Sequence, residues 1–502
     1  MSAAARFTWT AGVGLLTALL CLPFLRTAAS LGDEGVLLNG AQRMLRGERL
    51  YQDIFEILPP GGLVLTAAWL RVAGESFLSV RILAIGTIVA IACLTYAACW
   101  RVSRHAPLSA ALVLGWVVLS QGLWTQLNHH WIVTMCSMTA AWAALKALDG
   151  DGRDRRWPVI AGLVAGAGAM VTPAIGAVTM LALLAAFTPP RRRLMDLVRY
   201  CLSGLVVPGL LIVYLAWNDL LRTAIDDVIV FAGTRYAPMQ AVPFGYGVGP
   251  ANYPLTYVFP AAALLAIAVW LRGPRDRYLL LVTALALSGL AASFPRPDVS
   301  HIAFEVPLAC PLIACAATRL TQAWTPALRF VSAMVVLICV LPGLVAFTGM
   351  AATAARAPKV ATARGPITFF DHDGIEETLA RLDQLPRADR VLFYPFIPLL
   401  PYLSARQHVT RYDVFTPGYT TVAQYRDACA AMMRDADWAV TFPTGTSPEI
   451  LAVTWPLLKN VSPPEWIWFE RALDRGFTVV ARMGLFELRQ RRAGPGDGLC
   501  DF

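Results

Sequence analysis

Long apolar runs recur along the chain as far as about residue 349 and then stop. A helix needs about 20 apolar residues to cross a bilayer, so these runs predict membrane spans. We predict eleven spans, at 9–28, 77–100, 107–124, 130–148, 158–171, 174–188, 200–216, 254–271, 278–293, 302–318 and 327–349. Only Thr172-Pro173 separates the short spans 158–171 and 174–188, so one kinked span is the alternative there. The fold class is a polytopic α-helical membrane protein with about eleven transmembrane helices.

The pattern changes after about residue 365. Segments 373–385, 421–435 and 464–475 have helical spacing. The runs "RVLFYP", "WAVTF", "FTVVAR" and "LFELRQ" are typical of strands. This alternation predicts a small C-terminal α/β domain over residues 350–502, attached to a transmembrane domain over residues 1–349. Only Cys429 and Cys500 of the ten cysteines lie in this C-terminal domain, where a disulfide between them is one option.

The distribution of charged residues along the chain predicts on which side of the membrane each loop lies. The net charge of +9 could indicate nucleic-acid binding, but residues 350–502 hold 17 basic and 17 acidic residues. Sixteen of the other 25 basic residues lie at the N-terminus and in alternate loops, around Arg101, Arg153, Arg192, Arg275 and Arg319. Basic loops stay in the cytoplasm. We therefore expect a multi-pass protein of the cell (inner) membrane, with a cytoplasmic N-terminus, an extracytoplasmic C-terminal domain and no nucleic-acid partner.

The first apolar segment ends in "RTAAS", which resembles a signal-peptide cleavage site. We expect an uncleaved anchor, because an acidic pair follows so closely. The outer loop 29–76 then begins with Asp33-Glu34 and an amphipathic segment, 34–46, that predicts a helix lying at the membrane interface. The segment 63–73 is too short to span and also belongs at the interface. For the acidic pair, helix capping is the alternative to a functional role.

A second polar cluster, "FPRPDVSHIAFEVP", begins the span 302–318. Asp298, His301 and Glu305 are spaced by three and four residues, which places them on one face of a helix. Glu305 would enter the bilayer, where an ionisable side chain is costly and therefore a functional candidate. Arg296 stands just outside, and the planar fork of arginine binds phosphate well. The alternative is a capping aspartate beside an arginine at the interface.

Two further outer loops carry polar residues. His129 and His130 precede the fourth span, but adjacent histidines do not have the spacing of helical metal ligands. We therefore predict no dedicated metal site, while a divalent metal cofactor stays open. The loop 217–253 carries Asp226, Asp227, Arg235 and Tyr236, which suit a flexible loop over a sugar or lipid and equally an ordinary loop. Nucleotide-binding and metalloprotease motifs are absent from the sequence.

With these residues in view, the chain resembles a GT-C superfamily glycosyltransferase that uses a lipid-linked sugar. That superfamily includes protein O-mannosyltransferases, the aminoarabinose transferase acting on lipid A, and mycobacterial arabinofuranosyltransferases. The residue-level resemblance lies in "GDEG", "GERLYQD", "PPGG" and "SVRILA", and recurs in "RPDVSH". It implies a polyprenyl-phosphate sugar donor and a cell-envelope glycan, lipid or protein acceptor. It also implies Asp33 as the general base and Glu34 as its neighbour that orients the sugar or acceptor.

The remaining candidate contacts are our own inference. We expect donor phosphate or sugar contacts from these residues: Arg296, Asp298, His301, Arg81, Tyr51, His129 and His130. Arg296, Asp298 and His301 should line one outer-face cavity with Asp33, because both loops emerge on the same side and a leaving phosphate needs positive charge. The alternative function is a non-catalytic carrier or scaffold for a lipid-linked or anionic glycan. Transporters, however, place polar residues near the midplane and within repeats, a pattern that this chain lacks.

Overall fold

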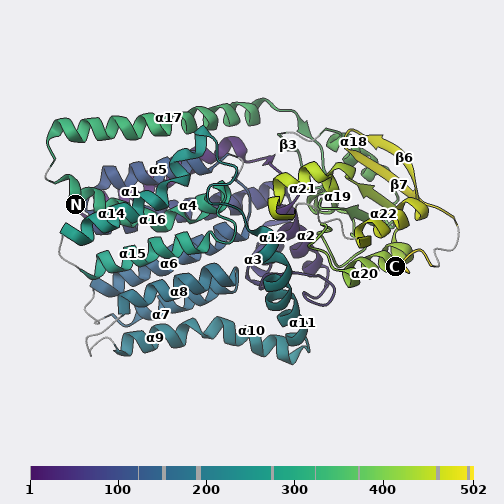
Figure 1. The fold of residues 1–502 in the computed structure, drawn as a ribbon, viewed down its shortest axis with the longest axis horizontal. Helices are drawn as coiled ribbons and strands as arrows, with labels where there is room; N and C mark the ends of the chain where they lie inside the picture. The colour runs from purple at the N-terminus through teal and green to yellow at the C-terminus, as the bar shows by residue number, and fades with distance from the viewer. Residues whose placement is uncertain are drawn as a thin grey trace.

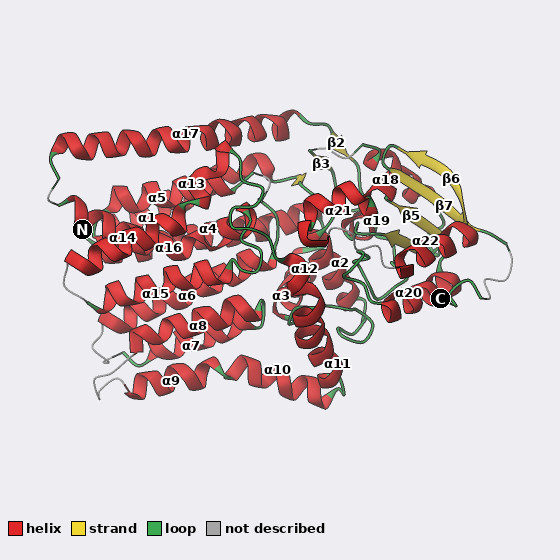
Figure 2. Cartoon of the chain, in the orientation of Figure 1, coloured by secondary structure: helices red, strands yellow, loops and turns green. Residues whose placement is uncertain are grey.

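The computed structural model describes residues 2–122, 124–149, 154–187, 194–272, 276–322, 324–370, 373–458, 464–493 and 498–501. The predicted cytoplasmic residues Arg153, Arg191, Arg192, Arg193 and Arg275 lie outside these ranges. Most of the chain up to residue 356 forms a bundle of roughly parallel helices, and a smaller region of helices and strands sits at one end of it (Figures 1 and 2). The N-terminus lies at the opposite end of the bundle (Figure 1).

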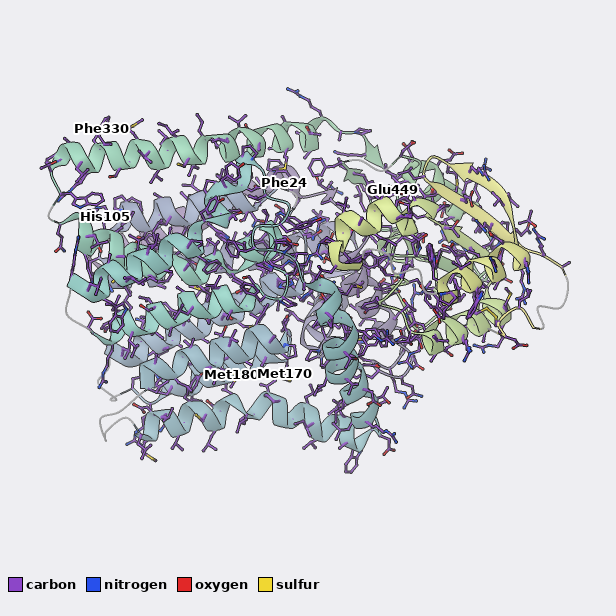
Figure 3. The ribbon with its side chains drawn as sticks, in the orientation of Figure 1. Phe24, His105, Met170, Met180, Phe330 and Glu449 are labelled. Atoms are coloured by element: carbon purple, nitrogen blue, oxygen red, sulfur yellow. A yellow bond between two sulfur atoms is a disulfide. The ribbon has the colours of Figure 1, made fainter. Side chains whose placement is uncertain are left out.

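Within the described residues, seven helical segments are long and apolar enough to cross a membrane. They are α1 (Ala3–Cys21) with η1 (Leu22–Phe24), α4 (Phe77–Ser103), α6 (His129–Asp149), α9 (Leu194–Gly204) with α10 (Val206–Trp217), η4 (Pro250–Asn252) with α13 (Tyr253–Thr256) and α14 (Val258–Arg272), α16 (Val299–Thr321) and α17 (Pro326–Arg356). Apolar side chains such as Phe330 project from the outer face of α17 (Figure 3). The chain is therefore a multi-pass membrane protein.

The other four predicted spans correspond to shorter helices that lie alongside the long ones (Figure 1). They are α5 (Ala106–Ser120), α7 (Arg156–Ala169), α8 (Pro173–Phe187) and α15 (Arg277–Ala292). At 14 to 16 residues and about 1.5 Å per residue, each is shorter than the apolar thickness of a typical bilayer. The count of eleven spans therefore stays a prediction, whereas seven meet the length of a spanning helix.

Short helices cover the end of the bundle that faces the sheet (Figure 1). They are α2 (Asp33–Leu45), α3 (Gly61–Ala73), α11 (Leu221–Ile225), the π-helix η3 (Asp226–Tyr236) and α12 (Ala237–Gln240). The predictions of an amphipathic helix at 34–46 and a short apolar helix at 63–73 are confirmed by α2 and α3. Both come from the predicted outer loop 29–76, which therefore packs as ordered structure against the bundle.

The C-terminal region contains a four-stranded sheet in the order β4-β5-β7-β6. Its strands are β4 (Val391–Tyr394), β5 (Trp438–Thr441), β6 (Phe477–Met483) and β7 (Phe486–Arg491). β4 and β5 are parallel, and the other pairs are antiparallel. All four predicted strands are confirmed, and so are the three predicted helices, as α18 (Ile375–Gln384), α20 (Val422–Asp435) and α22 (Pro464–Gly476).

The C-terminal region also contains α19 (Leu399–Ser404), η5 (Pro443–Thr446), α21 (Pro448–Thr454) and η6 (Pro456–Leu458). A disulfide joins Cys429 on α20 to Cys500, so the open option of a bridge between them is realised. A second, small sheet crosses between the two regions of the chain. Its strand β1 (Thr27–Ala28) pairs with β3 (Ile367–Phe369), which pairs with β2 (Lys359–Val360).

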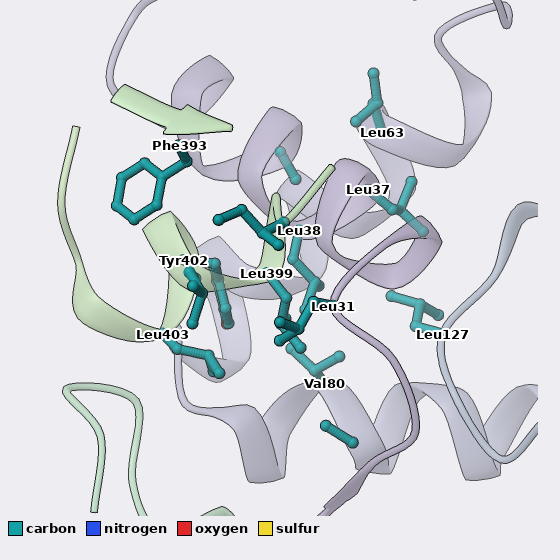
Figure 4. Close-up of a cluster of buried hydrophobic side chains, with 14 of the residues drawn as sticks. Leu31, Leu37, Leu38, Leu63, Val80, Leu127, Phe393, Leu399, Tyr402 and Leu403 are labelled. Atoms are coloured by element: carbon teal, nitrogen blue, oxygen red, sulfur yellow. The ribbon is translucent and has the colours of Figure 1, made fainter. Parts of the chain in front are cut away.

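The first loop and the C-terminal region share one apolar core. Leu31 and Leu38 pack with Leu399 and Tyr402 beside the start of α4 (Figure 4). The backbone N–H of Leu399 donates a hydrogen bond to the carbonyl of Leu31, at 3.0 Å. A Cβ at Gly35 would lie 2.1 Å from that same Leu399 nitrogen, so α2 approaches α19 as closely as only glycine allows. The C-terminal region is thus seated directly on the helix that begins with Asp33.

Candidate active site

A cavity of about 540 Å³ lies between the end of the bundle and the C-terminal region. Its wall comes from the first outer loop, the starts of α6 and α16, the end of η3 with α12, and the segments around β4, β5 and α21. Polar side chains gather on the bundle side, and aromatic residues such as Phe442 and Trp455 line the opposite side. The size suits a ligand larger than one small metabolite.

Asp33 is the first residue of α2, and its side chain faces this cavity. The N-cap position is Gly32, which makes no side-chain cap bond, and no hydrogen bond is recorded for the Asp33 carboxylate among the described residues. The alternative that Asp33 caps this helix through its side chain is therefore wrong. Protein surrounds the Asp33 side chain, and the part of its surface that stays accessible faces the cavity. This burial raises the pKa of the Asp33 carboxyl above its usual value, while the nearby charges of His301 and Arg296 oppose the rise.

Asp298 organises the start of α16. It is the N-cap residue, and its Oδ1 accepts hydrogen bonds from the backbone N–H of His301 at 3.0 Å and from Ser300 Oγ at 2.7 Å. The same oxygen lies 2.8 Å from His301 Nδ1. Burial alone would raise the pKa of Asp298, but its hydrogen bonds with His301 and Ser300 lower the pKa below its usual range. Asp298 is therefore a fixed anion that holds the His301 ring against the cavity.

Arg296 connects three parts of the chain. Its Nε donates to Asp298 Oδ2 at 2.7 Å, its Nη1 to Gln240 Oε1 at 3.0 Å, and its Nη2 to the carbonyl of Thr454 at 2.9 Å. These partners belong to the start of α16, to α12 and to the end of α21. The guanidinium lines the cavity while most of its fork is occupied. Arg296 thus joins the bundle to the C-terminal region and carries positive charge at that junction.

Three histidines and Phe304 form an aromatic cluster at the cavity wall. His129 and His130 begin α6, with ring centroids 4.2 Å apart. The His130 ring lies stacked on Phe304 at 4.8 Å and meets the His301 ring edge-on at 4.8 Å. All three histidines line the cavity together with Asp33. Arg296, Asp298 and His301, which the sequence predicts beside Asp33, also line this cavity.

Three predicted site residues lie elsewhere. Glu34 and Arg81 are fully buried and form an ion pair with each other, and neither lines the cavity. Tyr51 is 2% exposed, and its hydroxyl donates to the carbonyl of Leu58 at 2.8 Å, away from the lining. We expected Arg81 and Tyr51 to contact the ligand, and this expectation is wrong. Both side chains are buried, bind other parts of the protein and do not line the cavity. Glu34 stands beside Asp33 in sequence but points into the core.

Glu305 is also buried in α16 and does not line the cavity. The cavity instead contains two carboxylates that sequence reasoning missed, Glu56 and Asp413. Burial raises the pKa of Glu56 to about 7 and that of Asp413 to about 6. The available signal in the sequence was an acidic residue between apolar ones, Glu56 in "IFEILPP" and Asp413 in "YDVFTP".

The arrangement suits proton transfer next to a developing anion. Among the residues that the structure describes, Asp33 offers a carboxylate without a hydrogen-bond partner, and Arg296 and His301, which lower its pKa, lie in the same lining. Within the described residues, no group of three or more His, Cys, Asp and Glu side chains is placed to hold a metal ion.

No protein-family model matches the chain. No curated protein matches it in sequence.

Several solved structures resemble it in fold. ArnT from Cupriavidus metallidurans, bound to undecaprenyl phosphate, superimposes with a TM-score of 0.58 at 15% identity, over 98% of this chain and all of that one. The archaeal oligosaccharyltransferase AglB from Archaeoglobus fulgidus, in complex with an inhibitory peptide and a dolichol-phosphate, gives 0.57 at 12%, over 97% of this chain and 74% of that one. The arabinofuranosyltransferase AftD from Mycobacteria, as a mutant, gives 0.52 at 16%, over 98% and 42%. The chain therefore has the fold of the GT-C superfamily of glycosyltransferases.

Proposed function

We propose that the protein is a membrane glycosyltransferase that moves a sugar from a polyprenyl-phosphate donor to an extracytoplasmic acceptor. The proposal depends most on the carboxylate of Asp33, which faces a cavity together with Arg296 and His301. Two structures of the same fold were solved with a polyprenyl phosphate bound, which supports a donor of that class. A donor with a lipid tail also suits a cavity at the end of a bundle of membrane helices.

The chemistry follows from the positions of these groups. The acceptor hydroxyl attacks the anomeric carbon and forms the new C–O bond, while the bond from that carbon to the phosphate oxygen breaks. Asp33 takes the hydroxyl proton as general base. The electron pair of the broken bond stays on the polyprenyl phosphate, whose growing charge is stabilised by Arg296 and His301. Asp298 keeps both side chains oriented, because its Oδ2 accepts a hydrogen bond from Arg296 Nε and its Oδ1 lies 2.8 Å from His301 Nδ1.

The topology is part of the proposal. Eleven spans, a cytoplasmic N-terminus and an extracytoplasmic C-terminal domain over residues 350–502 would place the cavity at the outer membrane surface. The distribution of basic residues supports this orientation. The transmembrane domain, residues 1–349, then supplies the catalytic groups, and the C-terminal domain covers them and contributes the aromatic wall. The proposed site would thus be reached by lipid-linked donors from the membrane.

The test uses the purified full-length protein in lipid vesicles. A panel of polyprenyl-phosphate sugars is supplied with an envelope extract as the acceptor source, and released polyprenyl phosphate is measured by mass spectrometry. We expect release from at least one donor, with transfer of its sugar to a component of the extract. Tight binding of donors without release from any of them would contradict the proposal and favour a carrier or scaffold.

A further inference from the structure

A pair of carboxylates lies in the cavity wall away from the residues assigned to the donor. Glu56 is 8% exposed and Asp413 is 9% exposed, and both line the cavity. Glu56 belongs to the connector after α2, whereas Asp413 comes from the C-terminal region between α19 and α20. The two residues are thus brought together only by the folded structure, and the reaction described above uses neither of them.

Specific hydrogen bonds fix the pair. The backbone N–H of Phe55 donates to the carbonyl of Arg411 at 2.8 Å, which sets residues 55–56 beside residues 411–413. Asp413 Oδ1 accepts from Asn39 Nδ2 at 2.9 Å. Asn39 lies six residues after Asp33 on α2, which corresponds to about 9 Å along the helix axis. Through Asn39, the carboxylate pair is thus tied to the same helix, α2, that begins with Asp33.

Each carboxylate keeps acceptor capacity toward the cavity. Glu56 Oε1 accepts a hydrogen bond from the backbone N–H of Leu58 at 3.1 Å, and the backbone N–H of Ile57 also donates to the Glu56 carboxylate. Each carboxylate oxygen of Glu56 and Asp413 either has a hydrogen-bond partner or remains accessible. Arg296 is the only arginine or lysine among the described residues of the lining. The accessible oxygens thus suit hydroxyl donors. The charge that Asp413 carries above its pKa of about 6 disfavours anionic ligands.

Aromatic rings complete this part of the wall. Phe55, Phe415 and Tyr419 line it. The Phe231 ring packs against two of them, with its centroid 5.0 Å from that of Phe55 and 5.0 Å from that of Tyr419. Aromatic side chains offer a large apolar face with fixed geometry. Carboxylate acceptors beside such faces match a sugar ring, which combines hydroxyl groups at its edge with apolar C–H groups on its face.

We propose that Glu56 and Asp413 form the acceptor subsite and that the acceptor is an uncharged, hydroxyl-rich glycan. This inference rests on the proposed function, because it assigns the second substrate of the same cavity. The two carboxylates accept hydrogen bonds from sugar hydroxyl groups, and the aromatic wall packs on the ring. The attacking hydroxyl is thereby held toward Asp33, whereas a single serine or threonine side chain offers only one hydroxyl group and cannot both attack and donate to the two carboxylates.

The first measurement is binding, which needs no turnover. Saturation-transfer NMR is recorded on the purified full-length protein with neutral oligosaccharides, with a sulfated oligosaccharide and with a serine-containing peptide. We expect signals from a neutral oligosaccharide only. Glu56→Gln and Asp413→Asn should each weaken this signal strongly, since losing a hydrogen bond to a charged group costs about a factor of ten or more in affinity. Glu376→Gln, on the exposed surface of α18, is the matched control and should bind as the wild type does.

The second measurement separates the two proposals. With a working donor, Glu56→Gln should raise the KM for the neutral glycan at least tenfold relative to the KM for the donor. The subsite is overturned if the variants keep wild-type acceptor KM and binding, or if only the peptide or the sulfated ligand binds. Failure of the proposed function has a different signature: the wild type consumes no donor, while the oligosaccharide signal and its sensitivity to Glu56→Gln persist. Circular dichroism excludes variants that fail to fold.

Discussion

Glu34 and Arg81 form a fully buried ion pair that joins α2 to α4. Arg81 Nη2 also lies 2.8 Å from Glu34 Oε2, its Nε donates to the carbonyl of Thr27 at 3.1 Å, and Glu34 Oε1 accepts from the N–H of Leu127 at 2.8 Å. One carboxylate of the acidic pair is therefore structural, and its neighbour Asp33 faces the cavity. The pair fixes α2 on the bundle and so fixes the position of Asp33.

Breaking this ion pair should destabilise the protein. Arg81→Ala leaves the Glu34 carboxylate buried and unpaired, and removing one partner of a buried pair costs about 3–5 kcal/mol. We expect a clear fall in melting temperature and yield in detergent. Arg71→Ala, at an exposed arginine of α3, is the control. If Arg81→Ala kept wild-type stability and lost only its affinity for the donor, the structural role would be contradicted and Arg81 would be a ligand contact.

The pH dependence of transfer should report the ionisation of Asp33. The base must be deprotonated, so the rate falls as pH falls through its raised pKa, above the usual value of about 4 for aspartate. The groups that act on it are His301 and Arg296, which lower its pKa, and Asp298, which raises it. His301→Gln removes a lowering charge, so the acid limb of log kcat/KM against pH should move to higher pH. A limb that stays in place, or moves to lower pH, would argue against this coupling.

Arg296 should matter for both charge and docking. Arg296→Ala removes a cation aimed at the leaving phosphate, a loss typically worth about 10²–10³ in rate, and also removes the bond to the Thr454 carbonyl. Arg296→Lys restores the charge without the planar fork. We expect partial rescue by lysine if charge dominates, measured as released polyprenyl phosphate. Arg222→Ala is an exposed control, and equal rates for all three variants would remove Arg296 from the mechanism.

The proposed topology can be checked by thiol labelling. His105 and Glu449 are exposed, His105 at the end of the bundle away from the C-terminal region and Glu449 on α21, where the C-terminal region meets the other end of the bundle (Figure 3). In a background without the exposed free cysteines Cys201 and Cys339, an impermeant reagent added outside should label Glu449→Cys and spare His105→Cys until the membrane is opened. The physical reason is the retention of basic loops such as that of Arg101 and Arg104 in the cytoplasm. The reverse pattern would invert the orientation.

The sequence alone was sufficient to predict those features that depend on the periodicity of apolar residues and on the order of the membrane spans. Apolar runs located the long helices, alternation located the four strands, and the side of the membrane assigned to each loop placed Arg296 and His301 near Asp33. The roles of Asp33 and Glu34 could not be separated in this way. Adjacent residues on a helix differ by only about 100° in direction, and the contact of Gly35 with Leu399 decides which carboxylate points inward.

The second part of the cavity depends on contacts between distant segments. Glu56 and Asp413 meet through the backbone bond from Phe55 to Arg411, and no local pattern predicts that pairing. Tyr236 was noted only as part of a flexible loop, but it ends a π-helix and lines the cavity. Tertiary packing overrides local preference in such segments. The roles assigned to individual residues of the cavity stay predictions.

The most direct test of the account is the turnover of Asp33→Asn. This change keeps the shape of the side chain and removes its ability to take a proton, so the release of polyprenyl phosphate with sugar transfer should fall by about 10²–10⁴. Folding should be preserved, since Asp33 has no recorded hydrogen-bond partner among the described residues. Asp383→Asn, at an exposed aspartate of α18, should turn over as the wild type does. An Asp33→Asn protein that folds normally and retains near-wild-type transfer would contradict the central claim.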